Sequence, residues 1–533
     1  MRLLALALVA CSSPAAAPTP PRPLHQLAAL PPQQPIDTEH FTGVVVCVRC
    51  HTAGDTAMRD AAGRDISPVI DTQSSMMALS ARDPYFLAAL RRELVANPAG
   101  KATIEPLCLR CHAPVGFAES PAIGLADVEA ATTPVAVLAR DGVGCLGCHA
   151  LAPDGLGEPE TFTGRAALRT DRVTFGALAA PLGEAMVTMS KTTPIHAAHV
   201  TESLLCASCH TVIVRALDAS GSPTGDELAE QATFLEWRDS DFAPSMRIDQ
   251  PCQSCHMPAG ADTPFSTRPP DAPSRPGYRR HTLRGGNAYL LERLSHATDW
   301  LDAPAHADEL AAAAADTREF LRTAAKLEVT HAHAAGEWHV VVKNLTGHKL
   351  PTGFPTRRMW LHVVGKDVRG RVVFESGGTR DGALVDGTGK RLDPAGTLLP
   401  HRNRIAAGDQ VAMWEAVPVD ARGAPTHLLL GAARFGKDDR ILPAGWRADR
   451  PDAARTHAIG VDGDTEFRPG EAGVTVVVPA STATVTFELD YQSIPPETIE
   501  SYDVRHPEAA RFVGLVAVRP VPEVLASVTQ AAQ

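Results

Sequence analysis

Large apolar side chains are scarce in this sequence, and so are unassigned cysteines and long hydrophobic runs. Aromatic residues make up 5% of the 533 residues, and a chain so poor in large apolar groups builds only a thin hydrophobic core by itself. Ten of the 11 cysteines lie inside one repeated motif, which leaves none for an ordinary disulfide framework. The apolar run at the N-terminus is too short to span a bilayer. The net charge of −11 argues against nucleic acid and anionic membrane surfaces as partners.

The sequence does contain five copies of the pentapeptide Cys-x-x-Cys-His, the attachment signature of c-type haem. In this motif two thiols form thioethers to the haem vinyl groups, and the adjacent imidazole binds the iron from one side. We therefore predict five covalently bound haem c groups. The attaching residues are Cys47 and Cys50, Cys108 and Cys111, Cys145 and Cys148, Cys206 and Cys209, and Cys252 and Cys255. The iron ligands that follow them are His51, His112, His149, His210 and His256.

The first ten residues are typical of a lipoprotein signal peptide, with a basic residue, an apolar run and small residues before the cleavage point. Leu8-Val9-Ala10-Cys11 is similar to a bacterial lipobox, in which Cys11 is lipidated; the alternative is a simple export signal with a stray thiol. Residues 11–40 are rich in Pro, Ala and Gln, as in an extended tether. We expect an exported protein of the periplasm or outer membrane that contacts the membrane only through an N-terminal lipid.

The remaining chain divides into a haem-binding part and a strand-rich part. Residues 41–285 carry the five motifs with roughly 50 residues per haem, too few for separate globules, so the haems must share one packed cluster. Residues 286–326 form a predicted helical connector, with an Ala-rich run from Ala307 to Ala325. Hydrophobic alternation then predicts an antiparallel β-sandwich over 327–533. Its clearest strands are Leu327–His331, Trp338–Val342, Met359–Val364, Arg371–Phe374 and Thr484–Leu489. The predicted fold class is therefore mixed: a mostly α and irregular multihaem domain followed by this sandwich.

The ligand on the second face of each iron decides between electron transfer and catalysis, because a second His or Met saturates the metal. His281 and His348 lie in Gly- and Pro-rich turns, which allow a side chain to approach a macrocycle closely. His196 and His199 share one face of a predicted helix before the fourth motif, and His40 precedes the first. Each of these histidines has an ordinary alternative as a surface or hydrogen-bonded core residue.

Three further groups are weighed as ligands. Met76 and Met77 form a pair that is typical of core packing, and one of them is a candidate thioether ligand for a single haem. His331 and His333 point to one side of a strand, but no third or fourth zinc ligand is evident nearby. Asp462-Gly463-Asp464 lacks the acidic spacing of an EF-hand, which favours a plain turn.

Several segments resemble bacterial multihaem cytochromes of the tetrahaem cytochrome c group, which includes electron acceptors of hydroxylamine oxidation. They are Ser74–Phe86, Cys108–Pro114, Asp141–Cys145, and Phe234–Ser240 leading to Cys255–Pro258. Met77 falls where that group usually has a ligating His, so the resemblance favours Met77 over Met76. The segments Gly347–Gly353 and Tyr491–Pro496 are similar to parts of exported multihaem proteins of uncertain role. The resemblance implies electron transfer, although the fifth motif and the β region depart from the tetrahaem pattern.

Three functions are compatible with these features. The first is an electron carrier between periplasmic or outer-membrane redox partners such as quinol dehydrogenases, cytochromes and terminal reductases. The second is a multihaem oxidoreductase acting on a small nitrogen or sulfur compound at one open haem. Pentahaem nitrite reductases have Cys-x-x-Cys-Lys at the active haem, whereas all five motifs here end in His, which counts against this function. The third is a docking or assembly role for the β region, although a sandwich fold does not by itself define a function.

Overall fold

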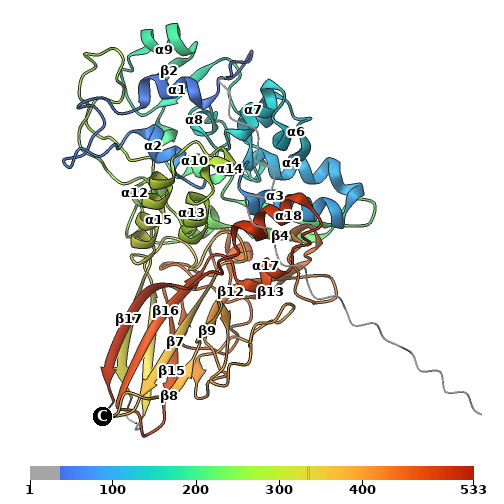
Figure 1. Ribbon diagram of the computed structural model, residues 1–533, viewed down its shortest axis with the longest axis vertical. Coiled ribbons are helices and arrows are strands. Elements are labelled where there is room, and N and C mark those ends of the chain that lie inside the picture. Colours follow the sequence, from blue (N-terminus) through green and yellow to red (C-terminus); the bar gives the residue numbers. More distant parts are fainter. Residues whose placement is uncertain (1–35, 333, 335, 533) are drawn as a thin grey trace, which may run out of the picture.

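The computed structural model describes residues 36–332, 334 and 336–532, which form a helical upper region and a β-sandwich below it (Figure 1). The predicted signal peptide, the lipidation residue Cys11 and most of the predicted tether lie outside the described residues. Among the helices of the described part, none combines the length and the apolarity that crossing a bilayer requires.

The upper region consists of short helices joined by long irregular segments. It also contains two small two-stranded sheets, the parallel pair β1–β2 and the antiparallel pair β3–β4. Its helices are α1 (Val44–His51), α2 (Pro68–Gln73), α3 (Pro84–Ala96), α4 (Lys101–His112), α5 (Pro114–Glu119), α6 (Leu125–Ala130), α7 (Pro134–Arg140), α8 (Cys145–His149), α9 (Gly183–Ser190), α10 (Leu204–Ala207), α11 (Thr233–Arg238) and α12 (Cys252–His256). Its strands are β1 (Val173–Gly176), β2 (Thr193–His196), β3 (Val212–Leu217) and β4 (Pro223–Gln231), and its 3-10 turns are η2 (Pro98–Gly100), η3 (Pro159–Thr161) and η4 (Ala198–Thr201).

The connector is helical but interrupted. It contains α13 (Ala288–Ser295), α14 (Thr298–Leu301) and α15 (Ala307–Leu321). Helix α15 begins at a capping box, in which the backbone N–H of His306 donates to Glu309 Oε2 at 2.7 Å. The predicted helix extends too far, because Ala325 and Lys326 already belong to the first strand of the sandwich.

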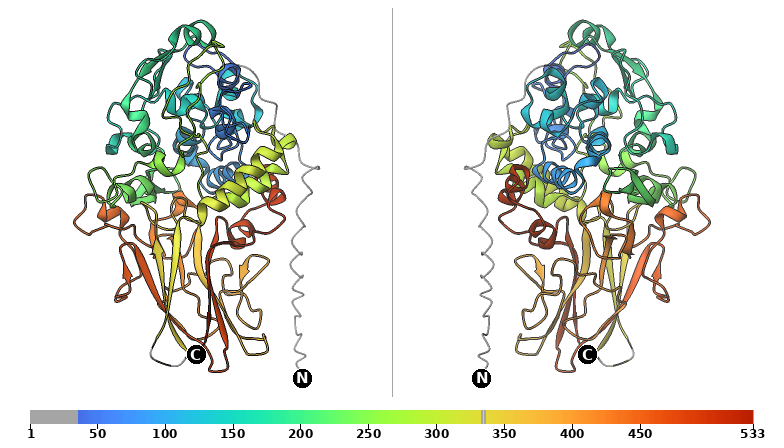
Figure 2. Two further views of the ribbon diagram at one scale, coloured as in Figure 1. Left: turned by 90° about the vertical axis from the view of Figure 1, so that its left-hand side faces the viewer. Right: turned by 90° about the vertical axis from the view of Figure 1, so that its right-hand side faces the viewer.

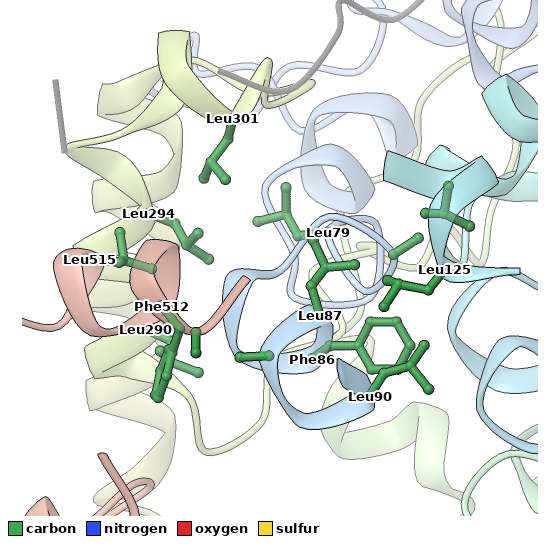
Figure 3. Close-up of a cluster of buried hydrophobic side chains, with 14 of the residues drawn as sticks. Leu79, Phe86, Leu87, Leu90, Leu125, Leu290, Leu294, Leu301, Phe512 and Leu515 are labelled. Atoms are coloured by element: carbon green, nitrogen blue, oxygen red, sulfur yellow. The ribbon is translucent and has the colours of Figure 1, made fainter. Parts of the chain in front are cut away.

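The largest hydrophobic cluster of the upper region joins three distant parts of the chain (Figure 3). Leu87 of α3, Leu290 of α13 and Phe512 of α18 (Pro507–Leu515) are all buried within it. Helix α18 packs against α3, although it comes from the segment predicted as a β-sandwich. The C-terminal part of the chain therefore leaves the sandwich, contributes α17 (Pro496–Glu500) and α18, and then returns to the sheet as its last strand.

The lower region is a sandwich of two sheets, seen edge-on in the two views of Figure 2. One sheet has the strand order β11-β15-β6-β5 with β14 paired to β15, and the other has the order β13-β12-β7-β16-β17 with β8 paired to β7. Their strands are β5 (Ala325–His331), β6 (Glu337–Asn344), β7 (Arg358–Lys366), β8 (Val372–Ser376), β11 (Arg404–Ile405), β12 (Met413–Val419), β13 (Arg434–Asp438), β14 (Phe467–Arg468), β15 (Glu471–Val477), β16 (Thr484–Gln492) and β17 (Glu523–Ala531). The pair β9 (Thr379–Arg380) and β10 (Ala383–Leu384), the turn η5 (Leu429–Gly431) and the helix α16 (Ala453–Thr456) lie in its loops.

Alternating burial explains why these segments form a sandwich. In β6, Trp338, Val340 and Val342 are buried and the residues between them are partly exposed. They face Leu361 of β7 and Phe487 of β16 in one core between the two sheets. All five segments predicted as strands coincide with strands, except that Arg371 lies just before β8, and the mixed fold class is confirmed. One detail differs from the prediction, because the short β11 pairs with β15 in parallel.

Candidate functional site

One continuous cavity of about 2030 Å³ runs through the upper region. All ten cysteines and all five histidines of the motifs line it, and within the described part of the chain these cysteines form no disulfide. Pockets for a single drug-sized ligand usually measure about 300–1,000 Å³. The cavity therefore has room for more than one large group, and the fold brings the five motifs to it from segments spread over more than 200 residues.

Helix geometry explains how each motif presents its three functional side chains. Helices α1, α4, α8 and α12 all end at the motif histidine, and α10 contains the first cysteine of the fourth motif. Residues three and four positions apart lie on the same face of a helix. The two cysteines and the histidine of a motif therefore face the cavity together.

The five motif histidines share one hydrogen-bonding pattern at Nδ1. Each Nδ1 lies against a carbonyl oxygen, and because such an oxygen can only accept, Nδ1 carries the proton and donates it. Nε2 is then left with its lone pair, the state in which imidazole binds a metal. The acceptors are Phe265 O for His51 at 2.8 Å, Ser80 O for His112 at 3.2 Å, Phe175 O for His149 at 2.6 Å, Gln231 Oε1 for His210 at 3.1 Å and Arg284 O for His256 at 2.5 Å.

Burial disfavours the protonated form of four of these imidazoles. It lowers the pKa of His112 to about 4 and lowers the pKa values of His51, His210 and His256 below the usual 6.5. The ring of Phe86 stacks on that of His112 with centroids 3.7 Å apart and planes 5° from parallel, which fixes the orientation of this imidazole. The site therefore supplies five oriented nitrogen ligands.

Two of the motif histidines face a second histidine across the cavity. The ring centroids of His149 and His281 lie 6.3 Å apart with 25° between the planes. Those of His256 and His348 lie 6.4 Å apart with 33° between the planes. Two metal–imidazole bonds of about 2.0 Å on opposite faces of one ion place the ring centroids roughly 6 Å apart. Both pairs have the separation that a six-coordinate iron between them requires.

The two opposing histidines carry the same Nδ1 pattern. His281 Nδ1 donates to Arg279 O at 2.9 Å, and His348 Nδ1 donates to Lys349 O at 3.0 Å. Burial lowers the pKa of each to about 4. The sequence singled out both residues because of their turns, and the structure adds which motif each one faces.

Thiol contacts give the order in which the motifs adjoin in space. Hydrogen bonding between thiols pairs Cys47 with Cys145, Cys111 with Cys209, and Cys206 with Cys252; it raises the pKa of the first thiol of each pair and lowers that of the second. Cys148 also lies close enough to Cys209 for the charge of Cys209 to raise its pKa, together with burial. The first motif therefore adjoins the third, and the fourth adjoins the second, third and fifth. This order differs from the order along the chain.

The remaining predicted ligands lie in different surroundings. Met76 and Met77 both line the cavity, but Met76 packs against the large hydrophobic cluster, whereas the carbonyl of Met77 accepts from Val143 N at 3.0 Å beside the third motif. The histidine His40 is half-buried with Nδ1 3.4 Å from Glu119 Oε1. His331 is exposed against Trp338, and His333 lies outside the described residues.

The prediction of a helical face that carries His196 and His199 is wrong. His196 is exposed at the end of β2, and His199 lies in the 3-10 turn η4. His199 Nε2 lies 3.0 Å from Leu151 O, so the nitrogen that would bind a metal is already occupied by a hydrogen bond. Neither residue lines the cavity. Residues 193–196 instead form an extended strand that pairs with β1.

Sequence reasoning missed His427, which reaches the cavity from a loop of the β region. Burial lowers its pKa to about 4. Arg92 Nη2 donates to His427 O at 2.8 Å, and Leu429 N donates to Glu93 Oε1 at 2.6 Å, which docks this loop on α3. Burial raises the pKa of Cys108 most, and the nearby charge of Glu93 raises it further. The loop docked on Glu93 therefore lies near the second motif. No motif surrounds His427 in the sequence, and only the fold identifies it.

The loop that carries His348 is held by a buried charged cluster between the two regions. Glu236 of α11 accepts hydrogen bonds from Lys349 N at 3.0 Å and Thr352 Oγ1 at 2.6 Å. Lys349 Nζ in turn lies 2.6 Å from Asp438 Oδ2, and Arg440 lies 2.7 Å from the same carboxylate. Glu236, Lys349 and Asp438 are all buried. This cluster positions His348 opposite the fifth motif.

The cationic side chains of the cavity suit carboxylate groups. Among the described residues, no lysine lines the cavity, but eleven arginines do: Arg49, Arg64, Arg92, Arg110, Arg165, Arg268, Arg275, Arg279, Arg280, Arg284 and Arg357. The guanidinium group binds carboxylates through two parallel hydrogen bonds, which lysine cannot do. Each haem carries two propionates, so the lining, the thiols and the free Nε2 atoms together fit haem c.

No family model matches the chain, and a search of curated proteins found no match. The structure is similar to the crystal structure of a penta-heme cytochrome c552 from Thermochromatium tepidum, with a TM-score of 0.53 and 18% sequence identity. The match covers 93% of this chain and 100% of that chain. At this identity the similarity shows the fold, which is the fold of a multihaem cytochrome c.

Proposed function

We propose that the chain is a pentahaem c-type cytochrome that carries electrons between redox proteins. The observation that carries the proposal is the shared state of the five motif imidazoles, each with Nδ1 donating to an oxygen and Nε2 directed to one cavity lined by ten thiols. The fold similarity to a penta-heme cytochrome supports it. Haem iron, when bound, supplies a one-electron ferric/ferrous couple.

The residues of this chain account for attachment, orientation and spacing. The cysteine pairs hold five groups covalently, and the Nδ1 acceptors hold each imidazole in one orientation. With haem bound, His281 and His348 would supply second ligands at the third and fifth motifs, which would leave no position there for substrate and suits electron transfer. Because the fourth motif adjoins three others, we propose it as the branch point of the electron path.

Spectroscopy on single variants tests this proposal. The purified protein is expected to carry the mass of five haems and to show bis-histidine low-spin signals in electron paramagnetic resonance. His281→Ala and His348→Ala should each change the signal of one haem, at the third and the fifth motif respectively. His339→Ala, a partly exposed strand histidine 3.4 Å from Glu466, is the control and should leave all signals unchanged. A polypeptide without added haem mass, or unchanged spectra in both variants, would contradict the proposal.

A second candidate function, an oxidoreductase for a small nitrogen or sulfur compound, is favoured by an asymmetry among the motifs. Within the described residues, no second imidazole ring faces His51, His112 or His210 at the separation seen for the other two motif histidines. His427 and Met77 also line the cavity and are candidates for second ligands there. A high-spin ferric signal that shifts on addition of nitrite or hydroxylamine would favour this function over electron transfer.

We further propose that the protein is exported and lipid-anchored through Cys11, and that its partners are quinol dehydrogenases, cytochromes or terminal reductases. The N-terminal sequence and the haem motifs support this, because bacterial haem c is attached outside the cytoplasmic membrane. Cys11→Ser is expected to move the protein from the membrane fraction to the soluble fraction of the periplasm. Membrane association that persists in this variant would contradict lipid anchoring.

A further inference from the structure

The outer face of the six-stranded sheet carries a cluster of one histidine and three carboxylates that the haem sites do not use. His362 lies on β7 directly opposite Glu488 of β16, and Asp490 follows two residues later on the same face. Glu375 of β8 pairs beside them, opposite Val364. The neighbouring Leu361 and Val363 point into the sandwich core, so the cluster faces away from it. It thus belongs to the β region alone.

The distances within this cluster fit a metal site. His362 Nδ1 lies 3.7 Å from Glu488 Oε2 and 3.6 Å from Asp490 Oδ2. One ligand atom from each of the three residues lies within 4.8 Å of the others. Ligands bound to one Zn²⁺ at about 2.0–2.2 Å are separated by roughly 3–4 Å. Two of the contacts already have that separation, and both converge on the same ring nitrogen.

The second ring nitrogen is oriented as in known zinc sites. His362 Nε2 lies 3.2 Å from Glu375 Oε1, which only accepts and therefore holds the proton on Nε2. Nδ1 is then left with its lone pair directed at the two carboxylates. Metal-binding histidines usually donate their other N–H to a carboxylate in this way. Ser527 Oγ donates to the second oxygen of Glu488 at 3.2 Å, which orients that carboxylate as well.

Asp490 supplies an independent reason to expect a cation. Its side chain is only 5% exposed, and its Oδ1 has no hydrogen-bond partner among the described residues. A buried carboxylate oxygen without a partner is costly, and a metal ion removes that cost. The pairing of β16 with β17 is also irregular between Leu489 and Asp490, and such bulges re-aim side chains next to functional sites.

We propose that His362 Nδ1, Glu488 and Asp490 bind one divalent transition-metal ion, with Glu375 holding the imidazole and water completing the coordination. One imidazole with two carboxylates is a ligand set of the Zn²⁺ class, because purely oxygen sites suit Mg²⁺ and Ca²⁺ and thiolate sites suit softer ions. The site is separate from the haem cavity, and its ligands do not line that cavity. Metal binding at this site can therefore be tested independently of the proposed electron transfer.

The test uses the full haem-containing protein, treated with a chelator and then titrated with Zn²⁺ by calorimetry. Zinc and iron are counted by elemental analysis after gel filtration. The expected result is one zinc per chain in the wild type and none in His362→Ala. Glu375→Gln, which keeps all three ligands, should weaken binding about 10–100-fold. The haem spectrum should be the same in all three proteins because the site is separate from the haem cavity, and circular dichroism of the three proteins reports that the sandwich is folded.

The matched control is His339→Ala, on the other sheet, where a single carboxylate of Glu466 lies 3.4 Å away. This variant should bind one zinc with the wild-type affinity. If the wild type binds no zinc, or if His362→Ala binds as tightly as His339→Ala, the proposal is overturned. If His362→Ala fails to fold, Glu375→Gln provides the test. Unchanged zinc affinity in that variant would contradict a site in which Glu375 holds the imidazole of His362 toward the metal.

Discussion

In the upper region the side chains surround a cavity of about 2030 Å³, whereas in the β-sandwich they fill the interior themselves. The sandwich core contains Val340, Leu361 and Phe487 without measurable exposure, contributed by facing sheets. The upper region has its own hydrophobic cluster around α3, α13 and α18, but the segments that carry the five motifs lie around the cavity. The interiors of the two regions are therefore built differently, and under the proposed function only the upper region depends on a bound group.

The largest effect should come from withholding haem. When the chain is produced where haem c is not attached, we expect residues 36–285 to lose most of their amide protection while β6, β7, β15 and β16 keep theirs. The reason is that the cavity would hold only water, whereas the sandwich buries its own side chains. Hydrogen exchange measured by mass spectrometry checks this segment by segment. Equal loss of protection in both regions would remove the contrast.

A deletion in the sandwich core should be the next largest effect. Phe487→Ala is expected to cost about 3–5 kcal/mol of unfolding free energy, because a fully buried aromatic side chain leaves a cavity. Denaturant unfolding followed by circular dichroism measures it, and the haem absorption should stay unchanged. Val368→Ala, at a residue that is 88% exposed, serves as the control and should change stability by less than about 0.5 kcal/mol.

The junction of the two regions provides a sharper test. Glu236→Gln should lower the free energy of unfolding by about 3 kcal/mol. The reason is that Arg440 is buried with its Nη1 3.5 Å from Glu236 Oε1, and the substitution removes this compensating charge. It should also alter the low-spin signal of the haem at the fifth motif, because Glu236 holds the loop of His348. Glu227→Gln is the matched control: its partly exposed ion pair with Arg455 also bridges the regions, and its loss should cost under about 1 kcal/mol. An unchanged spectrum in Glu236→Gln would contradict the role of Glu236 in positioning His348.

The smallest effect is a pH dependence confined to the β region. Burial lowers the pKa of His401, but hydrogen bonds to Asp439 and Asp464, both at 2.9 Å, outweigh burial and raise it above 6.5. A raised folded-state pKa gives a stability contribution that is complete below pH 6.5 and is lost as the pH rises through the folded value. The wild type should therefore lose on the order of 1 kcal/mol between pH 6 and 9 relative to His401→Gln. Parallel unfolding curves of the two proteins over this range would show that the contribution is absent.

Local sequence was a good guide wherever neighbouring residues decide the outcome. The cysteines and the histidine of a motif face the same side because residues three and four apart share a helix face. The strands of the sandwich follow from hydrophobic alternation, and His281 and His348 were singled out by the turns that carry them. The failure at His196 and His199 has the same origin, because a sequence spacing that fits a helix says nothing about the strand partner that prevents one.

Contacts between distant residues could not be predicted in this way. His281 follows the fifth motif closely in the chain, yet it faces His149 of the third. His427 reaches the cavity from the β region, and His362, Glu488 and Asp490 meet only because of the register between β7 and β16. Helix α18 packs against α3 across more than 400 residues of sequence. None of these pairings has a local signal.

The sequence by itself determined the chemical groups of this protein, which are five thiol pairs, each with an adjacent imidazole. Its alternating hydrophobicity also determined that the C-terminal region forms a β-sandwich. Only the tertiary structure decided which imidazoles oppose one another, which motifs adjoin, and that a second cluster of ligands lies on the outer sheet. The physical reason is that covalent and hydrogen-bonding capacity belongs to single side chains and their near neighbours. Coordination and electron transfer depend on distances between side chains, and those distances are set by packing across the whole chain.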